Sequence, residues 1–110
     1  DKSERFIASE IIREKIFLNY KQEIPYSSEV VVTSFKEEEN IIRVAAEIYV
    51  ERNTQKGIII GKKGEGIKKL GIESRLEMEE FFGKQIHLET FVKVDKDWRK
   101  DDQKLKKFGY

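Results

Sequence analysis

Two glycines that bracket two lysines, Gly61-Lys62-Lys63-Gly64, form the part of this sequence best suited to chemistry. Three isoleucines at 58–60 precede the tetrad, and a helical pattern of apolar and basic residues follows it. Glycine has no Cβ, so the chain can turn sharply here and bring its backbone close to a sugar-phosphate strand. Lysine charge at the same place attracts phosphate. The tetrad therefore predicts contact with a phosphate backbone, with apolar surface nearby for bases.

Two nucleotide-binding loops compete with this interpretation. A P-loop requires G-x-x-x-x-G-K-[ST], but the glycine before Gly61 lies one residue too close, and Lys63 stands where the hydroxyl residue belongs. A Rossmann fingerprint requires G-x-G-x-x-G within a parallel βαβ unit. Gly64 and Gly66 supply its first two glycines, but Lys69 occupies the third position, and we expect antiparallel strands around it. Both loops are disfavoured.

Hydrophobic periodicity and turn residues predict the elements that must position the tetrad. In order, these are a helix over 4–20, an extended connector at 24–28, strands over 29–36 and 42–51, a short helix ending at residue 60, a helix over 65–82, a strand over 85–94 and a charged tail helix over 97–107. A three-stranded sheet covered on one face by helices accommodates this order, which is an α+β fold. We expect one domain over 1–110, with an N-terminal helix within 1–20 and a helical tail at 97–110.

Single residues carry further expectations about these elements. Ser3 is suited to cap the first helix, Gly83 to end the long helix, and Gly71 to mark a close-packing site inside it. Tyr49 is expected on the exposed face of its strand. The residues expected on the buried helix stripes are Ile7, Ile11, Phe17, Leu18, Ile67, Leu70, Ser74, Met78, Phe81 and Phe82, with Ile12 and Ile16 beside the first stripe.

Charge is distributed in blocks although the net charge is only +1. Residues 54–69 carry five lysines and one glutamate, a net of +4, and residues 93–110 carry seven Lys or Arg and four Asp, a net of +3. Residues 1–40 and 70–92 are each at −3. Two basic blocks on a near-neutral domain indicate a local polyanion footprint, although solvated surface alone also accounts for charge runs.

Composition excludes several classes of site. The sequence has no cysteine and a single histidine, His87, so we expect neither a disulfide framework nor a metal site, and no cofactor is indicated. No apolar run approaches the roughly 20 residues that a membrane-spanning helix needs. The charged start, residues 1–5, shows no signal peptide, which predicts a cytoplasmic protein. It also looks like a cut from a longer chain.

A short helix, a G-x-x-G loop and a second helix with Ile67 just inside it resemble the KH fold. The second helix begins at the loop, so its free N–H groups and dipole favour anions. Ile58, Ile59 and Ile60 are expected to supply apolar groove wall together with Ile67. The order α-β-β-α-α-β, with a helix and hairpin before the motif and a strand after it, is that of the type II KH arrangement.

Further blocks resemble the C-terminal KH domain of the Era family of bacterial GTPases. They are Arg13-Glu14-Lys15, Glu23-Ile24-Pro25-Tyr26-Ser27, Ile48-Tyr49-Val50-Glu51-Arg52, Gln55 to Glu65, Phe82-Gly83-Lys84, Val92-Lys93-Val94, Lys96-Asp97-Trp98-Arg99 and Gly109-Tyr110. Nearly the whole chain is covered. Gly66 departs from the family pattern, which usually has a large apolar residue there, and we expect it to weaken the helix start slightly.

The resemblance implies binding of the single-stranded 3′ end of 16S ribosomal RNA during assembly of the small ribosomal subunit. Carried onto this sequence, the RNA-binding residues are Gly61, Lys62, Lys63 and Gly64 at the backbone, Ile60 and Ile67 at the bases, Lys56 and Lys68 at further phosphates, and Trp98, Arg99 and Lys100 in the tail. It also implies a GTPase domain outside this chain, and peripheral association with the inner membrane. We therefore expect no catalysis from these 110 residues.

A second hypothesis is a protein-docking module. The acidic segments 1–40 and 70–92 leave surface for contact with a GTPase domain or a ribosomal protein. Trp98 is open to two interpretations, as a stacking platform for a base or as an anchor that holds the tail against the domain.

Overall fold

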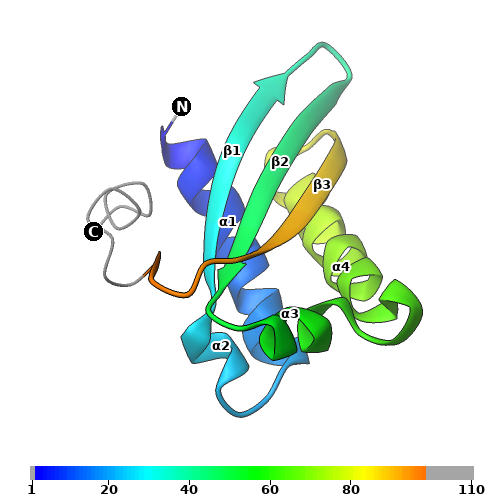
Figure 1. Ribbon diagram of the computed structural model, residues 1–110. Coiled ribbons are helices and arrows are strands. Elements are labelled where there is room, and N and C mark those ends of the chain that lie inside the picture. The colour runs from blue at the N-terminus through cyan, green and yellow to red at the C-terminus, as the bar shows by residue number, and fades with distance from the viewer. Residues whose placement is uncertain (1, 99–110) are drawn as a thin grey trace.

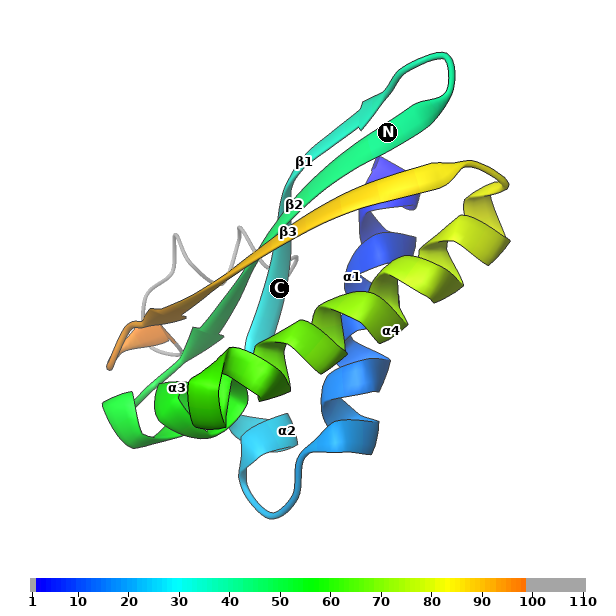
Figure 2. The ribbon, with the colours of Figure 1, turned by 90° about the vertical axis from the view of Figure 1, so that its right-hand side faces the viewer.

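The computed structural model describes residues 2–98, and the predicted order of elements is confirmed there, with one short helix added (Figure 1). The elements are α1 (Lys2–Asn19), α2 (Ile24–Ser27), β1 (Glu29–Glu37), β2 (Ile41–Val50), α3 (Asn53–Ile60), the 3₁₀ turn η1 (Lys62–Gly64), α4 (Glu65–Phe82) and β3 (Gln85–Val94). Figure 2 shows the helices gathered on one face of the sheet, as expected for this α+β class. Most of the predicted tail helix lies outside the described residues.

The three strands form a mixed sheet in the order β1-β2-β3. β1 and β2 are antiparallel, whereas β2 and β3 run parallel, from Ile41 opposite Gln85 to Val50 opposite Val94. The expectation that the strands around the glycine tetrad are antiparallel was therefore wrong for β2 and β3. The reason is that α3 and α4 together carry the chain back along the sheet, and a crossover of this length is what parallel pairing requires. As a result, β3 is an edge strand that lies beside α3 and α4 (Figure 2).

The core lies between the sheet and the helices α1 and α4, and only part of the stripe predicted on α1 faces it. Ile11 is buried as expected, and Ile7 is partly buried against the core. Ala8, Ile12 and Ile16 are spaced four residues apart and are essentially inaccessible to solvent. Phe17 and Leu18 were expected in the core and are exposed instead, by 58% and 68%. Each helical residue turns the side chain by about 100°, so these two point away from the line of Ile16.

The buried stripe of α4 also differs from the prediction at one position. Leu70, Ser74 and Met78 are fully buried as expected, again four residues apart. The next residue in that spacing is Phe82, which is partly buried and packs edge-on against Phe35 of β1, with 5.2 Å between ring centroids. Phe81, which was expected in the core, is 61% exposed.

The helix ends agree with the prediction at one position and differ from it at two. Gly83 ends α4 as predicted, in a left-handed conformation with its N–H bonded to the Glu79 carbonyl. Ser3 lies inside α1 and does not cap it, because the helix already includes Lys2. The connector around Pro25 is the helical turn α2 and not an extended segment, because proline is tolerated in a first turn, where no N–H is needed. Within residues 2–98, no helix is both long and apolar enough to cross a membrane.

Candidate nucleic-acid interface

The loop between α3 and α4 has the backbone geometry that its glycines predict. Gly61 has φ 75° and ψ 174°, and Gly64 is left-handed with φ 76°. Between them, Lys63 also has positive φ, at 56°, and both lysines are exposed. α4 begins directly after Gly64, so the lysines stand at its N-terminal end, where free N–H groups favour anions.

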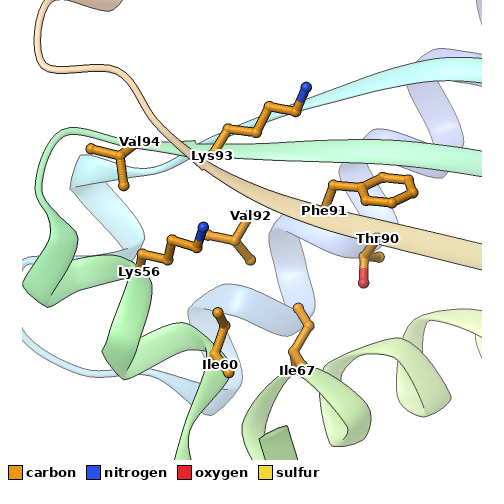
Figure 3. Close-up of a pocket in the computed structure, with 8 residues that line it drawn as sticks. All are labelled: Lys56, Ile60, Ile67, Thr90, Phe91, Val92, Lys93 and Val94. Atoms are coloured by element: carbon orange, nitrogen blue, oxygen red, sulfur yellow. The ribbon is translucent and has the colours of Figure 1, made fainter.

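The start of α3 is fixed by hydrogen bonds of the Gln55 side chain. Its Oε1 accepts the backbone N–H groups of Glu51 at 3.0 Å and Arg52 at 2.9 Å. Its Nε2 donates to Glu23 at 2.7 Å, which ties α3 to the segment before α2. Because Gln55 is buried and makes these three hydrogen bonds, the start of α3 is fixed, and the next residue, Lys56, is turned toward the groove (Figure 3).

A groove of about 610 Å³ runs between α3, the start of α4 and strand β3 (Figure 3). Three residues predicted for RNA contact, Lys56, Ile60 and Ile67, line it together. Ile60 and Ile67 point side by side toward β3 in Figure 3. Ile58 and Ile59 do not line it. Ile59 is completely buried in the core, and Ile58 is exposed elsewhere on α3.

The opposite wall of the groove was missed by sequence reasoning. It is formed by five consecutive residues of β3, namely Thr90, Phe91, Val92, Lys93 and Val94. In Figure 3, Thr90 points toward the helices, while Phe91 and Lys93 point to the other side of the strand. The alternation of β3 was visible in the sequence, but its place beside α3 follows only from the parallel pairing.

Lys68 lies beside the groove and not in its wall. It borders a second hollow of about 320 Å³ between α4 and β3, together with Gly71 and Arg75. This hollow shares Ile67 and Thr90 with the main groove, so the two lie side by side. The second hollow reaches along α4 to Arg75, a residue that the sequence did not single out.

The close-packing glycine of α4 is Gly66, and not Gly71 as the sequence suggested. A Cβ on Gly71 would meet no atom within 4 Å, so Gly71 is not a close-packing site. A Cβ on Gly66 would lie 2.7 Å from the Ile59 carbonyl oxygen and 3.1 Å from that of Ile60. A Cβ on Gly61 would lie 2.9 Å from the Gly66 nitrogen. Gly61 and Gly66 are thus the positions where α3 and α4 approach most closely.

Trp98 is buried on the opposite face of the sheet from the groove. It is 4% exposed and forms a small cluster with Val31 and Tyr49, whose neighbours in sequence face the helices. This arrangement matches the anchor interpretation of Trp98 and does not bring it to the loop. Tyr49, expected on an exposed face, is 3% exposed because Trp98 covers it. Arg99 and Lys100 lie outside the described residues.

The electrostatics around the loop are dominated by lysines without acidic partners. Among residues 2–98, no ion pair engages Lys56, Lys62, Lys63 or Lys68, whereas Lys93 on β3 pairs with Glu47 at 2.8 Å. The described part of the chain also contains no group of three or more His, Cys, Asp or Glu that could hold a metal ion. The arrangement can thus attract a polyanion at the loop and bury apolar or aromatic groups in the groove.

A type II KH domain is the class that this topology and this G-x-x-G groove define. A family model described as a KH domain matches residues 23–99, and the chain belongs to this family. The resemblance to the KH domain of Era is confirmed as well. The chain is similar over its whole length to the GTPase Era of Syntrophus aciditrophicus (59% identity), Geobacter metallireducens (52%) and Coxiella burnetii (48%). It spans only 37–38% of the length of these relatives.

Two solved structures share the fold. Era of Aquifex aeolicus bound to GDP·AlF₄⁻ superposes with a TM-score of 0.89 at 38% identity, covering 96% of this chain and 36% of that one. Era in complex with MgGDPNP and nucleotides 1506–1542 of 16S ribosomal RNA gives a TM-score of 0.90, with the same identity and coverage.

Proposed function

We propose that this chain binds single-stranded RNA with the loop Gly61–Gly64 and the groove beside it. The observation that carries the proposal is the juxtaposition of two exposed lysines, on a loop with glycine geometry, with an apolar groove open at the surface. A double helix would present its bases to each other, whereas a groove of this shape receives bases that are unpaired.

Each part of the site has its own role in this proposal. Lys62, Lys63 and the loop backbone hold phosphates, with Lys56 and Lys68 as further phosphate contacts. Ile60 and Ile67 receive the faces of bases. β3 is an edge strand, and its outward row of N–H and C=O groups is available to base edges. Apolar contact with base faces does not discriminate between bases, so base choice comes from the β3 backbone groups and from the β3 side chains that line the groove.

The substrate we propose is the 3′ end of 16S ribosomal RNA within the small ribosomal subunit. Its support is the similarity to Era, one structure of which contains nucleotides 1506–1542 of that RNA. In this proposal, GTP hydrolysis belongs to the part of the relatives that lies outside these 110 residues, and the KH domain itself carries out no catalysis. A cytoplasmic location is a prediction from the charged start of the sequence, and association with the inner membrane is a prediction from the resemblance. Binding to vesicles of anionic phospholipid would test the second.

Charge reversal in the loop tests the proposal. We expect Lys62→Asp/Lys63→Asp to nearly abolish binding of a short pyrimidine-rich RNA, measured by fluorescence anisotropy. Lys21→Asp/Lys36→Asp is the matched control, because it makes the same change in net charge at two exposed lysines outside the groove. Wild-type affinity is expected to fall with salt with a log–log slope of about −2 to −3, from a few phosphates at about −0.7 each. Equal affinities for both double variants would overturn the proposal.

Protein docking is the second candidate, and one surface favours it. Phe17 of α1 and Tyr26 of α2 are exposed by 58% and 70% and contact each other edge-on, with 6.4 Å between ring centroids. Leu18 beside them is exposed as well. Titration of the labelled domain with RNA, and then with a separately prepared GTPase domain of the same protein, distinguishes the two candidates.

A further inference from the structure

The carbonyl groups at the end of α3 lie directly behind the loop Gly61–Gly64. A helix leaves its last four carbonyls without partners inside the helix, and these carry partial negative charge. At the end of α3 the backbone turns at Gly61, whose N–H bonds to Gly57. The Ile59 and Ile60 carbonyls are left pointing toward Gly66 in the first turn of α4. Their negative ends thus lie close to the place where phosphate is expected.

A residue from a distant part of the sequence, Tyr20, lies against the Ile59 carbonyl. Tyr20 follows the last residue of α1, and its hydroxyl donates a hydrogen bond to the Ile59 carbonyl at 2.6 Å. The same hydroxyl oxygen lies 3.2 Å from the point where a Cβ on Gly66 would stand. Thus Tyr20, Ile59 and Gly66 bring α1, α3 and α4 into contact at one point, and this contact requires a residue without a side chain at position 66.

We propose that Tyr20 and Gly66 act together as positioning residues for the RNA-binding loop. The Tyr20 hydroxyl bonds to a carbonyl in the last turn of α3. Because Gly66 has no side chain, α4 can pack closely against this hydrogen bond, which fixes the angle between α3 and α4. The loop then presents its backbone in one conformation before RNA arrives. This inference rests on the proposed function, and it adds two residues that touch neither phosphate nor base.

The surroundings of Tyr20 suit this role. Burial raises the pKa of the Tyr20 hydroxyl, so it remains a protonated donor over the whole physiological range. The neighbouring residue Asn19 donates from its side chain to Glu73 of α4 at 2.8 Å. The end of α1 is thus hydrogen-bonded to both α3 and α4, the helices that flank the loop. Pre-organisation of this kind improves apparent affinity in proportion to the fraction of molecules already in the binding conformation.

Hydrogen exchange of the loop amides tests, without RNA, whether the contact of Tyr20 with Ile59 and Gly66 holds the loop in one conformation. In Tyr20→Phe we expect the amides of residues 62–67 to exchange about threefold to tenfold faster, the factor that one net hydrogen bond is worth. Tyr49→Phe is the matched control, because it removes a phenol hydroxyl that donates to Glu47, also at 2.6 Å, on the far face of the sheet. Unchanged exchange at the loop in Tyr20→Phe, or an equal increase in Tyr49→Phe, would overturn the inference.

RNA titration then separates positioning from direct contact. We expect Tyr20→Phe to weaken binding by up to about the same factor, with an unchanged salt slope because no phosphate contact is lost. Gly66→Ala should weaken binding more, because its Cβ must displace the Ile59 carbonyl. Faster exchange with wild-type affinity in both variants would refute the role in RNA binding. If the wild-type chain itself bound no RNA, the proposed function would fail. The exchange data would still decide whether Tyr20 and Gly66 position the loop.

Discussion

The cations of α1 and those around the G-x-x-G loop differ in whether they pair with carboxylates of the same chain. On α1, Arg13 pairs with the buried Glu29 and Lys15 with Glu77 of α4. The hydrogen bond to Glu77 raises the pKa of Lys15 above its ordinary value. Around the loop, Lys56, Lys62 and Lys63 have no ion-pair partner among residues 2–98.

This difference separates charge that stabilises the fold from charge available to a ligand. A lysine already bonded to a carboxylate must break that bond before it can bind phosphate, whereas an unpaired lysine gives up only hydration. Composition alone cannot make the distinction, because the two sets of residues are chemically alike. The comparison predicts that variants on α1 change stability and variants near the loop change RNA affinity.

The largest effect is expected at the buried carboxylate of the α1 contact. Glu29 is 2% exposed and accepts the backbone N–H of Val30 at 3.0 Å in addition to its pairing with Arg13. Glu29→Leu removes both acceptors, and we expect the free energy of unfolding to fall by about 2–3 kcal/mol. Urea denaturation measures this. RNA affinity of the folded variant should equal that of wild type, and a loss of affinity there would break the comparison.

A smaller effect, on binding alone, is expected from Lys56 in the groove wall. Lys56→Ala should reduce RNA affinity about threefold to tenfold, as the loss of one phosphate contact, and make the salt slope less steep by about 0.7. The free energy of unfolding should change by less than about 0.5 kcal/mol, because Lys56 forms no ion pair within the described residues. Lys36→Ala, on the β1 strand, is the control. A stability loss without an affinity loss would contradict the assignment.

Gly71 gives a prediction of the opposite sign. A Cβ there meets open space, and alanine is favoured over glycine inside a helix by up to about 1 kcal/mol. Gly71→Ala should therefore raise the midpoint of thermal unfolding slightly, whereas Gly66→Ala in the same helix should lower it. Because Gly71 borders the second hollow, an accompanying loss of RNA affinity would show that RNA extends along α4. A lowered midpoint for Gly71→Ala would contradict the packing described above.

The smallest effect concerns acid stability. Glu79 accepts the backbone N–H of Ile86 at 3.0 Å and pairs with Arg75, and these contacts hold the pKa of Glu79 below its ordinary 4.5. Since the folded pKa is lowered, this stabilisation is present above about pH 4.5 and is lost as the pH falls below it. Glu79→Gln should therefore show a shallower acid loss of stability than wild type below about pH 4.5. Identical acid titrations of the two proteins would show that Glu79 is not coupled to folding.

Local patterns predicted the loop and the elements that carry it. The glycines at 61 and 64 and the stop at Gly83 depend on short-range geometry, and the structure agrees at each. Of the three isoleucines before the loop, only Ile60 lines the groove as predicted. The predicted burial of Phe17 and Phe81 was wrong, because apolar residues flank the buried stripe on both helices. Only packing against the sheet decides which side of each helix is covered. The β3 wall, the parallel pairing and the tight approach at Gly66 depend on contacts between distant segments, which a single sequence does not contain.

The most direct test of the central claim is a chemical-shift map of ¹⁵N-labelled protein titrated with a short single-stranded RNA from the 3′ end of 16S ribosomal RNA. We predict that the perturbed amides cluster at Lys56, at residues 60–68 and at residues 88–94 of β3. Amides of the Val31–Tyr49 face and of the exposed α1 surface around Phe17 should stay at their free positions. Perturbations confined to the α1 surface, with the loop and β3 unchanged, would contradict the account.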